Sequence, residues 1–408
     1  MMIKKSREQG QVLILIAIGI VGLIGMVALA VDGGNAFMDR RNAQNAADAA
    51  AMSAGFAVVS KRDPNGAALS IAATNNYTND GTRSTVTVQY PPAAGCKGEI
   101  GPYAGNEEYL QVIIHSYLDT FFAQVVGITR IHNCVEAIVY IKPPYTEAMF
   151  NGNALVALNP EDCMAFDAGG TSGTVVTGGG VFVNSNSSCG QGAFRQHGAG
   201  ILTNEGVCVV GSYSYDPGKV TPPPAGGCQD EDYPPEIIYP DPVCEANASR
   251  SGTTWTAGNI SGNDFKGTME LGPGIYCISG NVTINAGDEI SGIGVLLYVM
   301  NGSFYVNGHA FVELEGLESG KYAGLLMYLP LSNTNPVELN GNSDSGYWGT
   351  IFAPASLIRI NGTGSATGYK SQIIGYNIEL VGNAATSIHY EDSMNYDATV
   401  PDSIELAK

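Results

Sequence analysis

Four patterns of apolar and polar positions divide the chain. Residues 12–31 form an apolar run without a charge, and residues 32–62 are rich in alanine at helical spacing. Residues 63–142 mix helical and alternating patterns, whereas residues 151–395 consist of short apolar runs separated by Gly and Asn. The period of the apolar positions distinguishes helices from strands. The sequence therefore predicts a mainly β protein with a long N-terminal helix.

The apolar run is long enough to cross a membrane. As a helix, the twenty residues from Val12 to Val31 span about 30 Å, the thickness of one hydrocarbon layer. Three basic side chains precede the run, at Lys4, Lys5 and Arg7. Because such residues favour the cytoplasmic side, we expect residues 1–11 inside the cell. The bulk of a single-pass cell membrane protein would then lie outside the cytoplasm, at the cell surface.

Two other fates of the N-terminal segment stay open. Ala28-Leu29-Ala30 fits signal-peptidase cleavage after Ala30, although the apolar run is longer than a usual signal sequence. Prepilin-type processing after Gly10 would favour a Glu five residues later, where the chain has Leu15. Retention as an anchor is the favoured interpretation.

The alanine-rich segment at residues 32–62 is predicted to continue the anchor as a helix. A stripe of small side chains lies on one of its faces, at Ala43, Ala47, Ala50, Ala54 and Ala57. Their spacing of three and four residues is that of one helical face. The stripe would pack closely, either on the next domain of the same chain or on another subunit.

The order of motifs around the apolar run resembles a known family. Glu8-Gln9-Gly10-Gln11 precedes the run, Ala30-Val31-Asp32-Gly33-Gly34 ends it, and residues 40–51 contain Arg40-Arg41 and Gln44-Asn45-Ala46-Ala47-Asp48 followed by three alanines. This order is similar to the N-terminal domain of TadE/TadG-like Flp pilus-assembly proteins. The resemblance implies an envelope anchor of the tight-adherence pilus system, and it carries no catalytic residue.

Residues 63–142 are predicted to form a small α+β domain. The expected elements are helices at 67–76 and 118–126 and strands at 84–90, 109–115 and 133–141. Pro143-Pro144 is a stiff break and a plausible domain boundary.

The repetitive region at residues 151–395 is predicted to be a parallel β-helix, or solenoid. Four similar turns end at glycines spaced 25, 21 and 20 residues apart, at Gly316, Gly341, Gly362 and Gly382. Repeats of this length with short strands and small corner residues are what a solenoid requires. An antiparallel sandwich or jelly roll stays open, because the sequence does not reveal strand direction. Residues 271–277, 291–295 and 349–354 also resemble β-helical regions behind Tad-type anchors.

The eight cysteines all lie beyond residue 95 and form no Cys-x-x-Cys pair. An even number in this arrangement favours disulfides in an oxidising compartment. We expect Cys96 to pair with Cys134 and leave the other six unassigned. Residues 217–251, rich in Pro, Asp and Cys, are expected to be a disulfide-tied loop extruded from the solenoid, and residues 396–408 a C-terminal tail.

Composition and motifs point away from catalysis. A formal net charge of −19 disfavours nucleic acid as a partner. The sequence contains no nucleophile elbow, phosphate loop or zinc motif, so we predict no enzyme activity, no catalytic residue, no cofactor and no metal site. The acidic run Asp230-Glu231-Asp232 is interpreted as a solvated loop. Asn340, Asn342 and Asp344 could bind calcium or simply form a turn.

Aromatic side chains in the repetitive region either fill its core or form a binding surface. They are Tyr298, Tyr305, Tyr328, Tyr347, Trp348 and Tyr369. On this sequence we predict an exported, membrane-anchored structural protein that assembles, anchors or decorates a Tad/Flp-type pilus, with adhesion as a further role. Its partners would be the membrane, pilin or pilus-assembly subunits that bind the 12–60 helix, and a surface glycan or protein. The alternatives are a carbohydrate-binding or carbohydrate-cleaving surface protein, and a pilin-like filament subunit.

Overall fold

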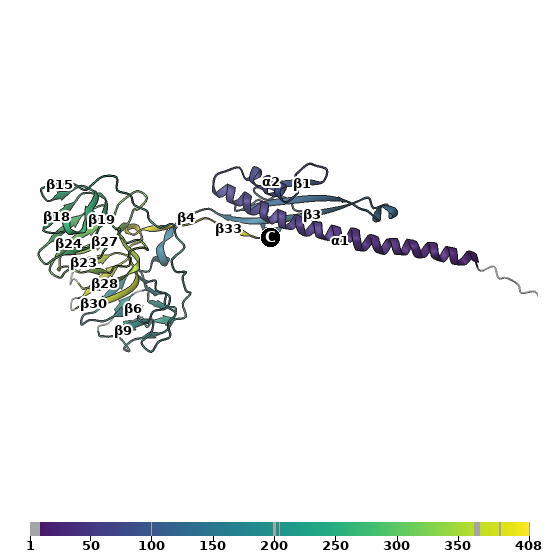
Figure 1. Ribbon diagram of the computed structural model, residues 1–408. Helices are drawn as coiled ribbons and strands as arrows, with labels where there is room; N and C mark the ends of the chain where they lie inside the picture. Colours follow the sequence, from purple (N-terminus) through teal and green to yellow (C-terminus); the bar gives the residue numbers. More distant parts are fainter. Residues whose placement is uncertain are drawn as a thin grey trace, which may run out of the picture. The chain divides into compact units, whose positions relative to one another are not determined.

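The computed structural model describes residues 9–98, 100–198, 201–203, 205–362, 368–382 and 385–407 (Figure 1). The chain divides into two compact units, of which the first comprises Met1–Pro144 and Asp402–Lys408. The second unit, Tyr145–Pro401, is therefore an insertion between two segments of the first. Each unit has its own hydrophobic core.

One continuous helix, α1 (Gln9–Val59), contains both the apolar run and the alanine-rich segment. Its 51 residues correspond to a length of about 77 Å. The apolar part is almost entirely exposed and has a mean hydropathy of 3.0 over its most apolar 18-residue window. Among the described residues, α1 is the helix whose length and composition suit a membrane span. The expected long apolar helix is confirmed.

The alanine stripe of α1 packs on a four-stranded antiparallel sheet of the same unit. The strand order is β1 (Ser84–Gln89), β2 (Tyr109–Asp119), β3 (Arg130–Lys142) and β33 (Ser403–Leu406). The five alanines of the stripe are at most 2% exposed. Helix α2 (Pro64–Thr74) packs against α1 as well and is capped by Asp63, whose carboxylate accepts two backbone N–H groups. The stripe thus contacts the chain's own domain.

Two predictions are wrong, one for the β2–β3 hairpin of this unit and one for the C-terminal segment, which spans both units. A helix was expected at residues 118–126, but β2 continues to Asp119, which pairs with Arg130 in the β2–β3 hairpin. Only a short 3₁₀ turn, η2 (Ala123–Val126), follows at the tip of the hairpin. The tail expected at residues 396–408 instead contains β32 (Asp397–Val400) and β33, because both segments find strand partners. A second 3₁₀ turn, η1 (Gly101–Tyr103), precedes β2.

The second unit is built from three ladders of mostly parallel strands. The first ladder contains, in spatial order, β13 (Val220–Thr221), β10 (Ile201–Thr203), β7 (Thr174–Thr177), β31 (Thr386–His389), β29 (Tyr369–Lys370), β27 (Gly346–Trp348), β24 (Phe311–Glu315), β21 (Glu289–Gly292), β18 (Thr268–Leu271), β16 (Thr254–Trp255) and β15 (Arg250–Ser251). Only its last pair, β15 and β16, is antiparallel.

The second ladder contains β14 (Ala225–Gly226), β11 (Val207–Val209), β8 (Val181–Val183), β5 (Leu155–Ala157), β30 (Ile373–Val381), β28 (Thr350–Asn361), β25 (Leu325–Tyr328), β22 (Val295–Val299), β19 (Gly274–Ser279) and β17 (Gly258–Ser261). The third ladder contains β12 (Tyr213–Ser214), β9 (Phe194–Gln196), β6 (Phe166–Ala168), the distal halves of β30 and β28, β26 (Val337–Leu339), β23 (Phe304–Val306) and β20 (Val282–Ile284). The strand direction that the sequence left open is therefore parallel.

The ladders enclose a core of stacked side chains. Tyr347 and Tyr369 are register neighbours in the first ladder, are fully buried, and have ring centroids 5.1 Å apart. The Tyr347 hydroxyl donates to the carbonyl of Asn340 at 2.7 Å, which satisfies the polar atom inside the core. Neighbouring strands of a ladder bury such side chains against each other, so the stacking of parallel strands provides the core.

The chain enters and leaves the stack at its middle. The first strands of the unit, β5 and β7, pair with the last strands, β30 and β31. From there the chain stacks outward to β13 and β14, passes to the opposite end at β15–β17, and stacks back to the middle. The entering strand β4 (Tyr145–Ala148) and the leaving strand β32 pair with each other. Short 3₁₀ turns are η3 (Met149–Gly152), η4 (Gly262–Asp264) and η5 (Asp392–Met394).

Residues 227–249, here called the return segment, connect the two ends of the stack. The sequence predicted an extruded loop, but this segment lies along the outer face of the second ladder. The ring of Tyr239 stacks on that of Phe352 at 5.9 Å, and the Ile238 amide donates to Thr399 at 2.8 Å. Burial of these apolar side chains favours the packed path over an extruded one.

All eight cysteines form disulfides. The expected pair Cys96–Cys134 is confirmed in the first unit. The others are Cys163–Cys189, Cys208–Cys228 and Cys244–Cys277. Cys208–Cys228 fastens the return segment to β11 near one end of the stack, and Cys244–Cys277 fastens it to β19 near the other.

Candidate functional site

Polar side chains of α1 hold the helix on its sheet. The Asp39 carboxylate accepts hydrogen bonds from Asn133 Nδ2 at 2.8 Å, from the Ser116 hydroxyl, and from the Tyr77 hydroxyl at 3.2 Å. Burial, together with the charge of Asp39, raises the pKa of Tyr77. One carboxylate of the helix therefore joins β2, β3 and the loop after α2. Five residues further along, Gln44 donates to the backbone of β3 at Glu136, 3.0 Å away.

A second carboxylate marks the end of the apolar run. Asp32 is 4% exposed and accepts the backbone N–H groups of Phe121, Phe122 and Ala123 at 2.9, 2.9 and 2.7 Å. The bond from Phe121, aided by those from Ala123 and Phe122, lowers the pKa of Asp32 although burial opposes this. Asp32 thus fixes the tip of the β2–β3 hairpin to the helix. The resemblance drew attention to Asp32, but its spacing did not reveal this contact.

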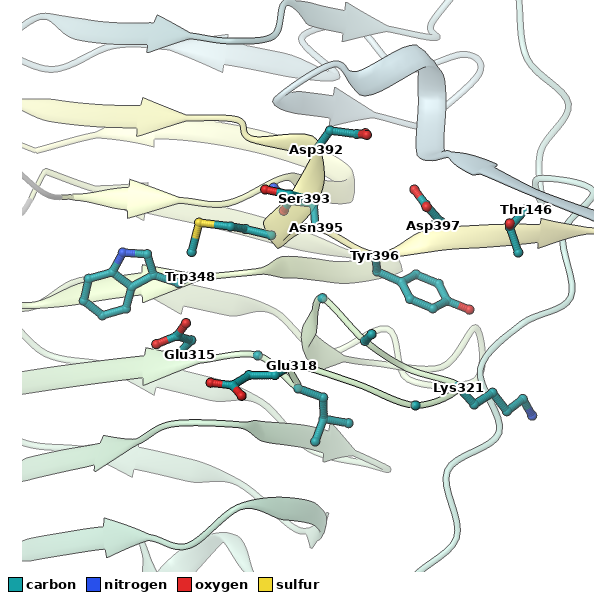
Figure 2. A pocket seen from close by; sticks show the side chains of 16 residues that line it. Thr146, Glu315, Glu318, Lys321, Trp348, Asp392, Ser393, Asn395, Tyr396 and Asp397 are labelled. Atoms are coloured by element: carbon teal, nitrogen blue, oxygen red, sulfur yellow. The ribbon is translucent and has the colours of Figure 1, made fainter.

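The second unit contains an open cleft of about 500 Å³ on its surface. It lies between the end of β24 with the loop that follows it, β27, and the segment from η5 to β32. Figure 2 shows Trp348 and Glu315 close together, Glu318 beside Glu315, and Asp392 with Ser393 on the opposite segment. Glu315 and Trp348 are register neighbours on adjacent strands.

The cleft is acidic and partly aromatic. Its charged lining consists of Glu315, Glu318, Asp392, Asp397 and Lys321. Burial, together with the negative charge of Asp392, raises the pKa of Asp397. Such carboxylates can accept hydrogen bonds from hydroxyl or amino groups, while the half-buried indole offers an apolar surface.

The lining residue Asn395 and Gly346, which precedes Trp348 by two positions, have structural roles at the cleft. The amide oxygen of Asn395 accepts from Thr350 at 3.2 Å and from the backbone of Gln372 at 2.8 Å. Gly346 leaves room for the indole, because a Cβ at this position would lie 2.5 Å from the Trp348 ring. The carboxylates come from strands β24 and β32, from the loop after β24 and from η5, and only Glu315 belongs to one of the repeated turns, so the sequence pattern did not bring them together.

The aromatic residues singled out in the sequence divide into two groups. Tyr347 and Tyr369 are buried in the core between the ladders, as the core interpretation expects, whereas Tyr328 is buried in the outer cluster that the return segment covers. Tyr298, Tyr305 and Trp348 are half-buried, and of these Trp348 lines the cleft. The side chains predicted to be either a calcium site or a turn act within a turn, since Asn342 Oδ1 accepts from the Asp344 amide at 2.9 Å.

Two of the histidines lie together in the first unit, whereas the acidic run predicted to be a solvated loop lies in the return segment of the second. His115 and His132 are neighbours, with ring nitrogens 2.9 Å apart, and burial followed by the charge of His132 lowers the pKa of His115. Asp230-Glu231-Asp232 is exposed in the return segment, where burial of part of the Glu231 side chain raises its pKa. Within the described part of the chain, no group of three or more His, Cys, Asp or Glu side chains is arranged to hold a metal ion.

Residues 10–59 match the Tad family model, whose description reads "Putative Flp pilus-assembly TadE/G-like". The match covers nearly all of α1, including Asp32, Asp39 and Gln44. The predicted resemblance of the N-terminal segment is therefore confirmed. Comparisons with curated proteins and with solved structures gave no match. Together, the Tad match and the exposed apolar helix support a membrane-anchored protein associated with a Tad/Flp pilus system.

Proposed function

We propose that the protein is an exported, single-pass structural component of a Tad/Flp-type pilus system, which carries a rigid surface domain and catalyses no reaction. The observation that carries this proposal is the continuity of α1. Its apolar half is exposed while its alanine-rich half is buried on the chain's own sheet. A helix of this kind transmits the position of the anchor directly to the exported domain, without a flexible joint.

The orientation follows from charge and from cysteine chemistry. Lys4, Lys5 and Arg7 precede the apolar run, which favours a cytoplasmic N-terminus. Four disulfides in the remainder of the chain favour an oxidising compartment. The domain after Asp32 therefore faces the outside in this proposal.

The three parallel ladders support a β-solenoid for the second unit. Register neighbours in the first ladder lie 22 residues apart from Ile290 to Val312, and again from Tyr347 to Tyr369. A coil of this length fits three short strands with three corners. Such a stack is a rigid spacer and offers a broad surface, which suits decoration or anchoring of a filament.

A partner surface remains on α1 itself. Because the alanine stripe is already covered, a pilin or assembly subunit would bind the opposite, exposed side, which carries Phe37, Met38, Met52 and Phe56. A photo-crosslinking amino acid at Met38 should capture a pilus subunit in cells that assemble pili, whereas the same probe at buried Ala47 should not. Equal capture at both positions would contradict this binding mode.

The experiment for the whole proposal is deletion of residues 1–34 in the native cell. The truncated protein should leave the membrane fraction and pilus function should be disrupted. Normal pili in the deletion strain would contradict the role. Recovery of the intact chain as a stoichiometric component of purified pili would instead indicate a filament subunit.

The cleft favours a second candidate function, the binding of a surface glycan. Trp348 beside Glu315 offers an apolar face next to hydrogen-bond acceptors, a combination suited to sugar rings. A glycan array and a reducing-sugar assay with the full chain test it. Binding lost in Glu315→Gln but kept in the control Glu270→Gln, an exposed residue of the same ladder, supports the site. Absence of binding and of cleavage removes this candidate.

A further inference from the structure

The tip of the β2–β3 hairpin, residues 120–128, exposes an unusual number of apolar side chains. Phe121 is 73% exposed, Phe122 40%, Val125 71% and Ile128 51%. The segment TFFAQVVGI contains no charged residue. A contiguous apolar patch on a small unit generally marks a surface that another phase or molecule covers.

The tip is an ordered structure. The Thr120 amide donates to Thr129 at 3.1 Å, and Val125 donates to Phe122 at 3.1 Å. Gly127, with φ of +87°, closes the 3₁₀ turn in a conformation that favours glycine. Its apolar side chains are therefore exposed by a defined backbone.

The position of the tip along α1 identifies what covers it. Asp32, which binds three backbone amides of the tip, directly follows Val31, the last residue of the charge-free run. Ala28, one helical turn earlier on the same side, is also buried, at 8% exposed. One turn corresponds to about 6 Å along the helix axis. In Figure 1 the hairpin runs alongside α1 toward its apolar half. The tip thus lies at the level where the helix would leave the hydrocarbon layer.

The strand pair directly next to the tip carries charges where the tip has none. Arg130 and Asp119 form an ion pair of 3.1 Å with both side chains exposed, and the Arg130 guanidinium lies 5.3 Å from the centre of the Tyr117 ring. An Arg and a Tyr above an apolar segment are typical of a membrane–water interface. The apolar side chains of the tip are therefore followed by charged and aromatic side chains, which is the order expected from the bilayer interior to the membrane–water interface.

We propose that the hairpin tip inserts into the outer surface of the lipid bilayer and forms a second contact with the membrane beside α1. This inference rests on the proposed anchoring by α1. Apolar side chains that lie about 5–10 Å deep at the boundary between headgroups and acyl chains are the usual form of such contacts. A helix alone can rotate about its axis, whereas a helix with a lateral lipid contact holds the first unit in one orientation.

The test uses the full chain reconstituted in phosphatidylcholine–phosphatidylglycerol vesicles. Phe121→Trp introduces a reporter at the tip, and Tyr90→Trp provides a control at the opposite end of the sheet, beyond the β1–β2 pair Gln89–Gln111. The parent chain, with Trp255 and Trp348 only, gives the baseline. Lipids brominated near the headgroup end of the acyl chains should quench the indole emission that Phe121→Trp adds to this baseline. The emission that Tyr90→Trp adds should stay unchanged.

The outcomes separate this inference from the proposed anchoring. If alkaline carbonate leaves the protein in the vesicles but Phe121→Trp is not quenched, the tip is outside the bilayer and only this inference is overturned. If carbonate releases the chain, the anchoring by α1 fails as well. Crosslinking between two copies through position 121 would assign the tip to a protein contact and also overturn the proposal. A doubly charged variant, Phe121→Glu with Val125→Glu, should remain anchored but show increased cleavage by protease at the tip.

Discussion

The return segment offers the sharpest test of the second unit. Removing its two bridges, by changing Cys208, Cys228, Cys244 and Cys277 to Ser, should release it from the stack. The bridged residues are separated by 20 and 33 positions. The loop-entropy relation gives about 3.3 and 3.7 kcal/mol for bridges of these lengths. The control, Cys163→Ser with Cys189→Ser, removes a bridge of separation 26, worth about 3.5 kcal/mol by the same relation, but does not touch the segment.

Limited proteolysis with a glutamate-specific enzyme distinguishes the two variants, because Glu236 lies within the return segment. The chain in detergent should be cut rapidly at Glu236 when both bridges are absent. At temperatures below the melting temperature of the control variant, the control should be cut at Glu236 as slowly as the parent chain. Its unfolding free energy nevertheless falls by about as much as the loss of either return-segment bridge would cost. Equal cutting in both variants would show that stability, and not attachment, protects the segment. If the fourfold variant does not fold, Cys244→Ser with Cys277→Ser is compared with the control instead.

Three further predictions concern the first unit and the core. Ala50→Leu should destabilise the first unit by about 1–3 kcal/mol through overpacking of the buried stripe, whereas Met52→Leu on the exposed side should have little effect, as measured by thermal unfolding in detergent. The pKa of Asp32 is lower in the folded state than in the unfolded state, so the contribution of Asp32 to stability is present above its unfolded pKa of about 3.9 and is lost as the pH falls through the lower folded value. The sensitivity of the hairpin tip to protease should therefore rise in acid. The variant Asp32→Asn should abolish that pH dependence. Tyr347→Phe should lower the unfolding free energy by about 0.5–1.5 kcal/mol, since a buried hydrogen bond of 2.7 Å to Asn340 is lost; an unchanged midpoint would contradict the assigned bond.

The sequence predicted well those features that depend on periodicity. A local periodic pattern marks the apolar run, the alanine stripe and the short strands of the repetitive region. The structure forms helix α1 over the first two and the strand ladders over the third. The error at residues 118–126 has a physical cause. The apolar residues of this segment have helical spacing, but they lie exposed at a hairpin tip whose backbone amides donate to Asp32. Contacts from distant segments override local preference.

Long-range features could not be predicted. The repeated turns appeared equivalent, yet Glu313 lies in the first ladder whereas Glu338, Arg359 and Glu379 are neighbours in the third. The entry of the chain at the middle of the stack depends on the pairing of β5 with β30, over two hundred residues apart. The cleft, likewise, arises where β24 and β27 meet the segment from η5 to β32, which follows them by more than forty residues, so no local pattern brought its carboxylates together.

The central claim is that α1 stays in the membrane as an uncleaved anchor with the folded units outside. Protease treatment of intact spheroplasts, followed by mass analysis of the protected fragment, tests it most directly. The account predicts a membrane-embedded fragment that retains residues 1–31, with the later segments accessible once the disulfides are reduced, apart from the hairpin tip at residues 120–128. A mature chain that begins at Val31 or Gln11, or a full-length chain protected in the cytosol, would contradict it.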